Sequence, residues 1–142
     1  MEDNKTESGF SFDNLILLES TFHRINNIAF DDKAQHSFNI HVGVATTKEG
    51  IIVSEDVTVK QVREDVEQYC ITAKMVGIFA RQGKSELKND EEFGRVNGAA
   101  IIFPFVREHI AGIALKGGLG TVLIPPVNFT KYVDAPDGEV SE

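Results

Sequence analysis

The sequence predicts an α+β fold, in which a long, interrupted helix packs on one face of a four-stranded antiparallel meander sheet. Four runs of alternating apolar and polar residues occupy the N-terminal half, and short turn-rich segments separate them. After residue 89, the apolar residues recur at helical spacing instead. Because the strands precede the helix rather than alternating with helices, the helix is expected on one face of the sheet.

The alternation is clearest in residues 36–45, where Phe38, Ile40, Val42 and Val44 occupy one face of the expected strand. Such a strand has one buried and one wet face, as in antiparallel sheets. The other strands are expected to begin near residue 15 and to cover residues 51–62 and 66–80. In the last run the apolar phase changes at residues 75–77, which predicts a β-bulge at Gly77.

The most apolar stretch of the chain, residues 97–110, contains Pro104. Proline has a fixed φ and no N–H, so Pro104 is expected in the first turn of a helix. We expect one long helical region that starts with a cap at Asn89 or Asp90, is irregular near residues 98–104 and ends at Gly117. Two consecutive prolines then make residues 121–129 extended.

Length and charge indicate one domain with acidic ends. The 142 residues suffice for a single core, and six of the net eight negative charges come from residues 1–8 and 134–142. We expect a disordered acidic tail at 1–12, a domain at 13–133 and a short acidic tail at 134–142. The near-neutral domain has no basic stripe, which argues against nucleic acid as a partner.

Three features of the sequence indicate the cytoplasm. The N-terminus lacks the basic and apolar regions of a signal peptide. No run of eighteen apolar residues is present, so membrane insertion is not expected. Cys70 is the single cysteine, so no internal disulfide can form, as is usual for a reducing compartment.

The residue types that carry chemistry do not combine into an enzyme site. The four histidines lack metal-ligand spacing, so neither a metal nor another cofactor is expected. Arg107, Glu108 and His109 are consecutive on a helix and therefore point in different directions. The glycine-rich segment 116–121 follows a helix, whereas a phosphate-binding loop precedes one. We therefore predict a protein without catalytic residues.

The aromatic residues Tyr69, Phe79, Phe103, Phe105 and Phe129 are more than one helix on one sheet face is expected to cover completely. Either they all belong to the core, or some of them line a groove. A groove with apolar, adaptable walls and no catalytic groups can hold an extended apolar polypeptide without reading its sequence.

Two segments resemble the SecB family of protein-export chaperones: Phe-Pro-Phe-Val-Arg-Glu at 103–108 and Pro-Pro-Val-Asn-Phe at 125–129. The resemblance covers roughly residues 13–133. It implies an ATP-independent holdase that forms a homotetramer, as a dimer of dimers, and passes unfolded precursor proteins to the SecA motor. It also implies client-binding residues at Tyr69 and Phe105, with Phe129 and Val133 near the end of the groove, and a SecA-docking carboxylate at Glu19.

The sequence departs from the family pattern in three places. Pro136 and Gly138 leave no room for the family's second helix after residue 129. His23 and Thr72 occupy positions where the family places docking carboxylates, and the C-terminal tail is acidic rather than basic. These departures favour chaperone activity over motor docking.

Three other functions stay open at this point. The chain could be a chaperone dedicated to a single partner, as in a toxin–antitoxin pair. It could carry a small molecule or lipid in a closed apolar cavity, or it could be a structural oligomer whose aromatic residues contact other subunits. Client competition, a ligand retained through purification, and a lack of client binding distinguish these alternatives.

Overall fold

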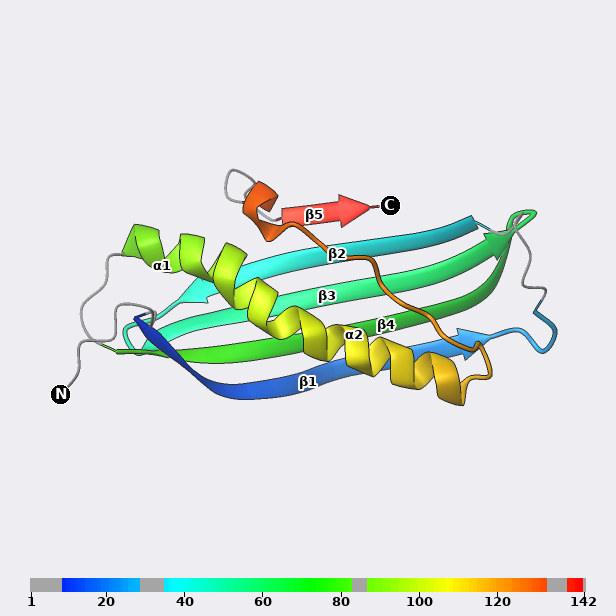
Figure 1. Ribbon diagram of the computed structural model, residues 1–142, viewed down its shortest axis with the longest axis horizontal. Coiled ribbons are helices and arrows are strands. Elements are labelled where there is room, and N and C mark those ends of the chain that lie inside the picture. The colour runs from blue at the N-terminus through cyan, green and yellow to red at the C-terminus, as the bar shows by residue number, and fades with distance from the viewer. Residues whose placement is uncertain (1–8, 29–34, 83–86, 133–137, 142) are drawn as a thin grey trace.

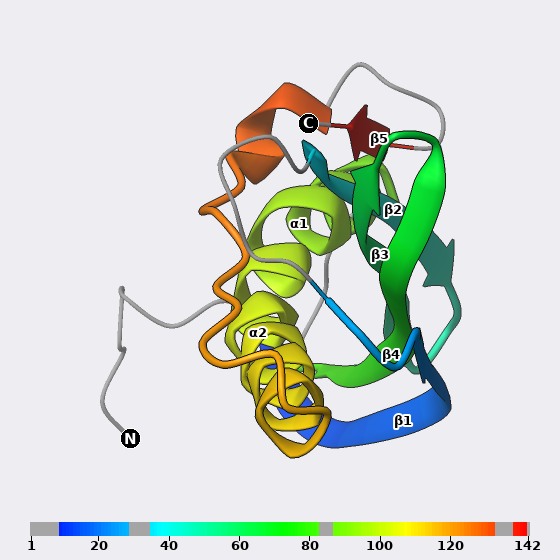
Figure 2. The same ribbon diagram turned by 90° about the vertical axis from the view of Figure 1, so that its right-hand side faces the viewer.

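A computed structural model describes residues 9–28, 35–82, 87–132 and 138–141. One face of a long, curved sheet carries a single helical segment, and the two layers are seen edge-on in Figure 2. The predicted α+β class, with an interrupted helix on one face of an antiparallel sheet, is confirmed. Residues 1–8 and 134–137 of the expected tails, and Val133 at the end of the expected domain, lie outside the described residues.

The sheet contains a strand more than predicted, and its order differs from a simple meander. Its strands are β1 (Phe10–Arg24), β2 (Gln35–Thr46), β3 (Gly50–Arg63), β4 (Val66–Arg81) and β5 (Gly138–Ser141). The order is β1-β4-β3-β2-β5, and all neighbours are antiparallel. Strands β2, β3 and β4 form a meander, whereas β1 pairs with β4 (Figure 1). The ten-residue connection 25–34 can reach about 30 Å and so spans the three strand spacings between β1 and β2.

Both tails are shorter than the sequence predicts. Strand β1 begins at Phe10, so residues 10–12, which were expected in the N-terminal tail, belong to the sheet. Strand β5 comes from the segment expected to be a C-terminal tail, and it pairs with Asn39–Val42 of β2.

The bulge predicted at Gly77 is wrong. The register of β4 is regular there, with Gly77 opposite both Leu15 and Val53. A Cβ atom at Gly77 would lie 2.6 Å from the side chain of Ile102 in the helix, so glycine permits close contact between the two layers. The bulges lie elsewhere, at Asp13 and Leu18 in β1 and at Gln68 in β4, where the register shifts by one residue.

The helical region runs without a break from α1 (Leu87–Phe93) through the π-helix η1 (Gly94–Gly98) to α2 (Ala99–Lys116). The irregularity predicted near residues 98–104 is thus a π-helix that lies earlier in the chain, at Gly94–Gly98. Pro104 lies inside α2 and not in a first turn, which corrects the sequence prediction. Its ring is on the exposed side of the helix. The carbonyl oxygen of Ala100, which loses its usual donor, belongs to an exposed residue that water can reach.

Asp90 does not cap the helix, contrary to the prediction. It is the fourth residue of α1, and its buried carboxylate pairs with the guanidinium of Arg81 at the end of β4. Arg81 also donates hydrogen bonds to the carbonyl oxygens of Thr47 (3.0 Å) and Lys48 (2.6 Å) in the β2–β3 turn. The ion pair thus joins the first helical turn to two parts of the sheet.

The helix ends as predicted, at two glycines. Gly118 has φ +74°, a conformation that glycine adopts without strain. The N–H of Leu119 donates to the carbonyl of Ala114 (2.9 Å), and the N–H of Gly118 donates to that of Leu115 (3.2 Å). These two bonds form a Schellman motif, which turns the chain back toward the sheet. Residues 119–128, the crossing segment, then run extended over the sheet to η2 (Phe129–Tyr132) (Figure 1).

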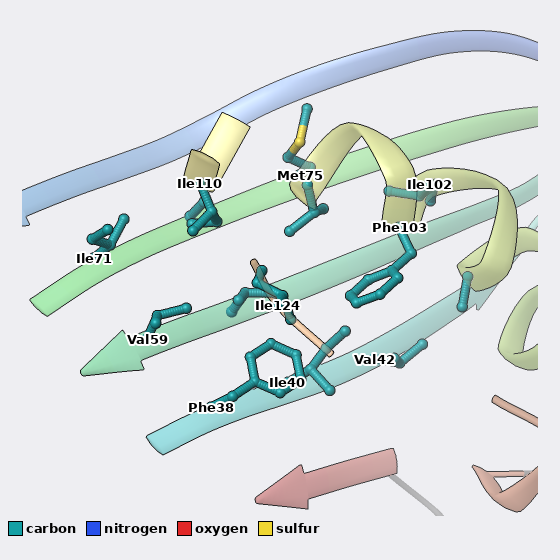
Figure 3. Close-up of a cluster of buried hydrophobic side chains, with 14 of the residues drawn as sticks. Phe38, Ile40, Val42, Val59, Ile71, Met75, Ile102, Phe103, Ile110 and Ile124 are labelled. Atoms are coloured by element: carbon teal, nitrogen blue, oxygen red, sulfur yellow. The ribbon is translucent and has the colours of Figure 1, made fainter. Parts of the chain in front are cut away.

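The core lies between the sheet and these two covers, as the side chains in Figure 3 show. The helical segment Asp90–Lys116 is long and apolar enough to cross a membrane by length and composition alone. Within the fold, however, Ile102, Val106 and Ile110 from this segment are fully buried against the sheet. Core packing therefore explains these three residues, whereas Ile101 and Phe105 of the same segment are 40% and 44% exposed.

Glu55 of β3 places a carboxyl group in this apolar core. Its side chain is fully buried beside Val42 and Met75, its partners on the neighbouring strands. Within the described parts of the chain, neither carboxylate oxygen has a hydrogen-bond partner. Burial raises the pKa of Glu55 to about 9, so the group is protonated and neutral at pH 7.

Candidate functional site

A partly open cavity of about 230 Å³ lies where the crossing segment passes over the sheet. Strands β2, β3 and β4 form its floor, and the crossing segment forms its opposite wall. The lining is mainly apolar with a few polar groups: His36, Ser37, Phe38, Val59, Tyr69 and residues 121–125. An apolar cavity with a small number of polar groups is the usual form of a binding site.

The crossing segment leaves this space because only some of its side chains reach the sheet. Leu119 and Ile124 are buried, and Figure 3 shows Ile124 above β2 and β3, close to Phe38 and Ile40. Leu123, by contrast, lines the cavity but is 69% exposed. The prolines after it prevent a regular hydrogen-bonded element from filling the gap.

Tyr69 and Phe129, two of the predicted client-binding residues, lie at or next to this cavity. Tyr69 lines it directly and is buried, and burial raises the pKa of its hydroxyl, which keeps the phenol protonated. Phe129 packs edge-to-face on Phe103, with ring centroids 5.5 Å apart. Phe103 lies 6.4 Å from the ring of Phe38, which lines the cavity. Phe129 therefore supports the cavity wall without lining it.

Phe105, also predicted to bind clients, lies in a different place. Its ring is 44% exposed and 6.2 Å from that of Phe12, which stacks on Phe79. Tyr69 and Phe79 are ten residues apart on β4, which is about 33 Å along a strand. Within the described residues, the structure thus separates Phe105 from Tyr69.

Phe105 belongs to a second apolar surface, where the exposed side of α2 meets β1. We call this surface the apolar flank; its side chains are each 38–44% exposed, and they are Phe12, Leu17, Phe22, Ile101 and Phe105. The hydroxyl of Ser20 and Nε2 of His109 are 2.8 Å apart in a hydrogen bond across the same junction. The apolar flank takes its residues from both β1 and α2, and none of them lines the cavity.

Comparison with known proteins identifies the relatives of this fold. The family model described as preprotein translocase subunit SecB matches residues 10–135. This chain belongs to the SecB family. Protein-export protein SecB of Methylococcus capsulatus is 28% identical over 137 residues, which cover 90% of this chain and 84% of the relative. Protein-export protein SecB 2 of Francisella tularensis subsp. novicida is 25% identical, and the match covers 91% and 90% of the two chains.

A solved structure supports the SecB-like fold. The SecB-like chaperone of Mycobacterium tuberculosis, in complex with a peptide from the HigA1 antitoxin, superposes with a TM-score of 0.73. The superposition covers 84% of this chain and 91% of that protein, at 8% sequence identity. The fold therefore persists where little sequence identity remains.

The outer face of the SecB-like sheet, opposite the helix, carries the residue predicted to dock SecA. Glu19 is exposed on β1, and its partner on β4 is Lys74. Lys74 also lies 3.8 Å from a carboxylate oxygen of Asp56. On the same face, Thr72 and Thr21 are joined by a hydrogen bond between their hydroxyls. Lys74 thus lies between two carboxylates and offsets one of their two negative charges.

The family resemblance places the end of the client groove near Phe129 and Val133. Val133, the last predicted client-binding residue, lies outside the described residues. Before it, residues 129–132 form a short 3-10 helix rather than the start of a long second helix. Sequence reasoning missed Val59, Ile124 and Leu123 as parts of the cavity. Only their apolar character could have indicated a binding role. The sequence does not show that the three residues lie together, because this depends on where the crossing segment passes over the sheet.

The described residues hold no group of three or more metal-ligating side chains close enough to bind an ion. The Ser20–His109 pair has the two types of a nucleophile and its base. In the described parts of the chain, however, no carboxylate orients the second nitrogen of His109.

Burial, followed by the charge of Glu67, raises the pKa of the Cys70 thiol, which disfavours a reactive thiolate.

Proposed function

We propose that this chain is a cytoplasmic, ATP-independent chaperone that holds unfolded precursor proteins for export. The observation that carries the proposal is the apolar cavity between the sheet and the crossing segment, in a member of the SecB family. Relatives named for protein export, each covered over most of its length, give further support.

The size of the cavity suits part of a polypeptide better than a whole small molecule. Drug-sized ligands occupy pockets of roughly 300–1,000 Å³, whereas this cavity measures about 230 Å³. It therefore accommodates one large apolar side chain of an extended client. Burying such a side chain contributes roughly 1.5–3 kcal/mol, so several contacts along one client give micromolar affinity after ordering costs.

The apolar flank fits contact with further copies of the chain. Exposed apolar side chains gathered along one junction, as these five are, often mark a protein–protein contact. We infer that Phe105 serves this contact and that the assembly is a homotetramer, of about four times 15.7 kDa. Phe105→Asp is then expected to reduce the mass measured by sedimentation. A wild-type protein that sediments as a monomer would contradict this assignment.

Docking to the SecA motor is a second part of the proposal. Glu19 is the carboxylate that the family resemblance matches, and Lys74 lies opposite it. We expect Glu19→Ala to weaken SecA binding several-fold and Lys74→Ala to strengthen it, because a positive charge is removed from the same surface. Isothermal titration calorimetry with purified SecA measures both changes in affinity.

The central test is the aggregation of a chemically unfolded client, followed by light scattering without ATP. Leu123→Asp places a charge at the cavity wall, and Leu115→Asp is its matched control on α2. The two leucines are 69% and 70% exposed, so neither change is expected to unfold the protein. We expect Leu123→Asp to lose suppression and Leu115→Asp to retain it. If wild type suppresses no client, the holdase function is wrong.

A chaperone dedicated to one partner is the second candidate. The solved neighbour, whose fold covers 84% of this chain, is a SecB-like chaperone with a bound antitoxin peptide. Competition among several unfolded proteins distinguishes the two functions. A general chaperone binds them with similar affinities, whereas a dedicated one prefers a single partner.

A further inference from the structure

The edge of strand β2 is occupied by the chain's own C-terminal strand. Strand β5 (Gly138–Ser141) pairs antiparallel with Asn39–Val42, so that His41 lies opposite Glu139 and Asn39 opposite Ser141. Without β5, the backbone N–H and C=O groups on this side of β2 would have no strand partner among the described residues. An unpaired edge of this kind is a template for strand addition by another polypeptide.

The occupied edge adjoins the cavity. Residues 36–38 of β2 line the cavity, and the residues paired with β5 follow directly at 39–42. A polypeptide extended along the edge of β2 would therefore pass the cavity mouth within one or two residues. Backbone hydrogen bonds to the edge would supply affinity without regard to sequence, while the cavity would take one apolar side chain.

β5 has the properties of a displaceable strand. It is four residues long, and it covers only the middle of the twelve-residue strand β2. Strand β3, on the other side of β2, pairs along its whole length from Gln35 to Thr46. A short edge strand tethered to the same chain competes with a client as an intramolecular ligand, and it weakens the apparent client affinity without blocking it.

We propose that the edge of β2 is a strand-addition site for extended apolar polypeptides, and that β5 occupies this site in cis until a client displaces it. The proposal rests on the holdase function proposed above, because it specifies how the client's backbone is held.

The first test weakens β5 in the full-length protein. Val140→Pro removes a donor and fixes φ within β5, whereas Glu142→Pro, one residue beyond the strand, is the matched control. We expect Val140→Pro to increase affinity for an extended apolar peptide about tenfold, and Glu142→Pro to leave it unchanged. The same peptide N-methylated at alternate residues loses the donors that strand addition needs. The affinity of the N-methylated peptide should therefore be the same for Val140→Pro and wild type.

The second test locks β5 in place. His41→Cys with Glu139→Cys, in a Cys70→Ser background, puts two thiols opposite each other in the register. We expect the oxidised protein to bind the peptide at least tenfold more weakly than the same protein after reduction. Hydrogen exchange at residues 39–42 reports the edge directly. Among residues 39–42, the amides that face β5 should be protected in wild type, exposed in Val140→Pro and protected again when peptide is added, whereas those that face β3 should stay protected throughout.

The outcomes separate this inference from the proposed function. If the locked, reduced and Val140→Pro proteins bind the peptide equally and wild type suppresses aggregation, clients do not use the edge of β2. The inference is then wrong while the holdase function stands. If neither wild type nor any variant binds an unfolded chain, both are wrong.

Discussion

Two covers lie on the same face of the sheet, and they differ in how completely they fill the space beneath them. Helix α2 presents Ile102, Val106, Ile110 and Ala114 at intervals of four residues, and all four are fully buried. The crossing segment buries Leu119 and Ile124, while Leu123 is 69% exposed and a cavity of about 230 Å³ stays open. A helix satisfies its own backbone and can press a full apolar stripe on the sheet, whereas an extended, proline-containing segment cannot.

The difference suggests a division of roles. The helix-covered part has the dense packing that fixes the fold, and the part under the crossing segment keeps an adaptable apolar site. Three changes test this comparison, beginning with the largest expected effect.

Glu55 under the helix is expected to have the largest effect on stability. Its pKa is about 9 in the folded protein, against 4.5 for the ordinary group. The unfolded chain therefore releases this proton above pH 4.5, while the folded chain keeps it until about pH 9. Its contribution to stability is complete below pH 4.5 and falls as pH rises toward 9, by about 3 kcal/mol at pH 7.

Glu55→Gln removes that titration and keeps the shape of the side chain. Urea unfolding at pH 5, 7 and 8.5 should show wild type losing stability across the series, with a much smaller loss in the variant. Equal slopes for the two proteins would mean that Glu55 is ionised in the folded state.

Gly77 tests the close packing between β4 and α2. Gly77→Ala places a Cβ atom 2.6 Å from Ile102, so one layer must shift, and we expect a loss of about 1–3 kcal/mol in unfolding free energy. Gly112→Ala is the control within α2, because a Cβ atom there meets nothing within 4 Å. That variant should be neutral or more stable by up to about 1 kcal/mol. Thermal unfolding of both variants checks the contrast.

Filling the cavity should have the smallest effect on stability and a clear effect on binding. Val59→Phe directs extra volume into the space beneath the crossing segment. We expect the unfolding free energy to change by less than about 1 kcal/mol, because the space is open, and client affinity to fall about tenfold. Ile52→Phe, on the outer face of the same strand and away from the cavity, should change neither quantity. Unchanged affinity in Val59→Phe would remove the cavity from client binding.

Local sequence patterns predicted most helices and strands well. Features that depend on contacts between distant parts of the chain were not predicted. The alternation around Phe38 and Ile40 gave strand β2 within a residue at each end, and Gly117 and Gly118 gave the helix end. Gly77 was misinterpreted because glycine at a core-facing position resembles a break in the apolar pattern. Pro104 was placed in a first turn because its position on the exposed side of a longer helix depends on packing with the sheet.

The candidate site was predicted only in part, for the same reason. Tyr69 was identified through the family resemblance, and the structure places it on the cavity wall. Phe105 has an equally apolar sequence context but lies on the apolar flank. Pairing of β1 with β4 and of β5 with β2 joins segments far apart in the chain, and no local pattern specifies either partner.

The pairing of β1 with β4 has a consequence for how the protein folds. β1 leaves the ribosome first, but the only strand that pairs with it in the described chain is made more than forty residues later. The hairpins β2–β3 and β3–β4 can form as soon as their turns are complete. The apolar residues of β1 must wait, and closing so long a loop is slow. A protein proposed to hold unfolded chains thus exposes an unpaired apolar strand of its own during synthesis.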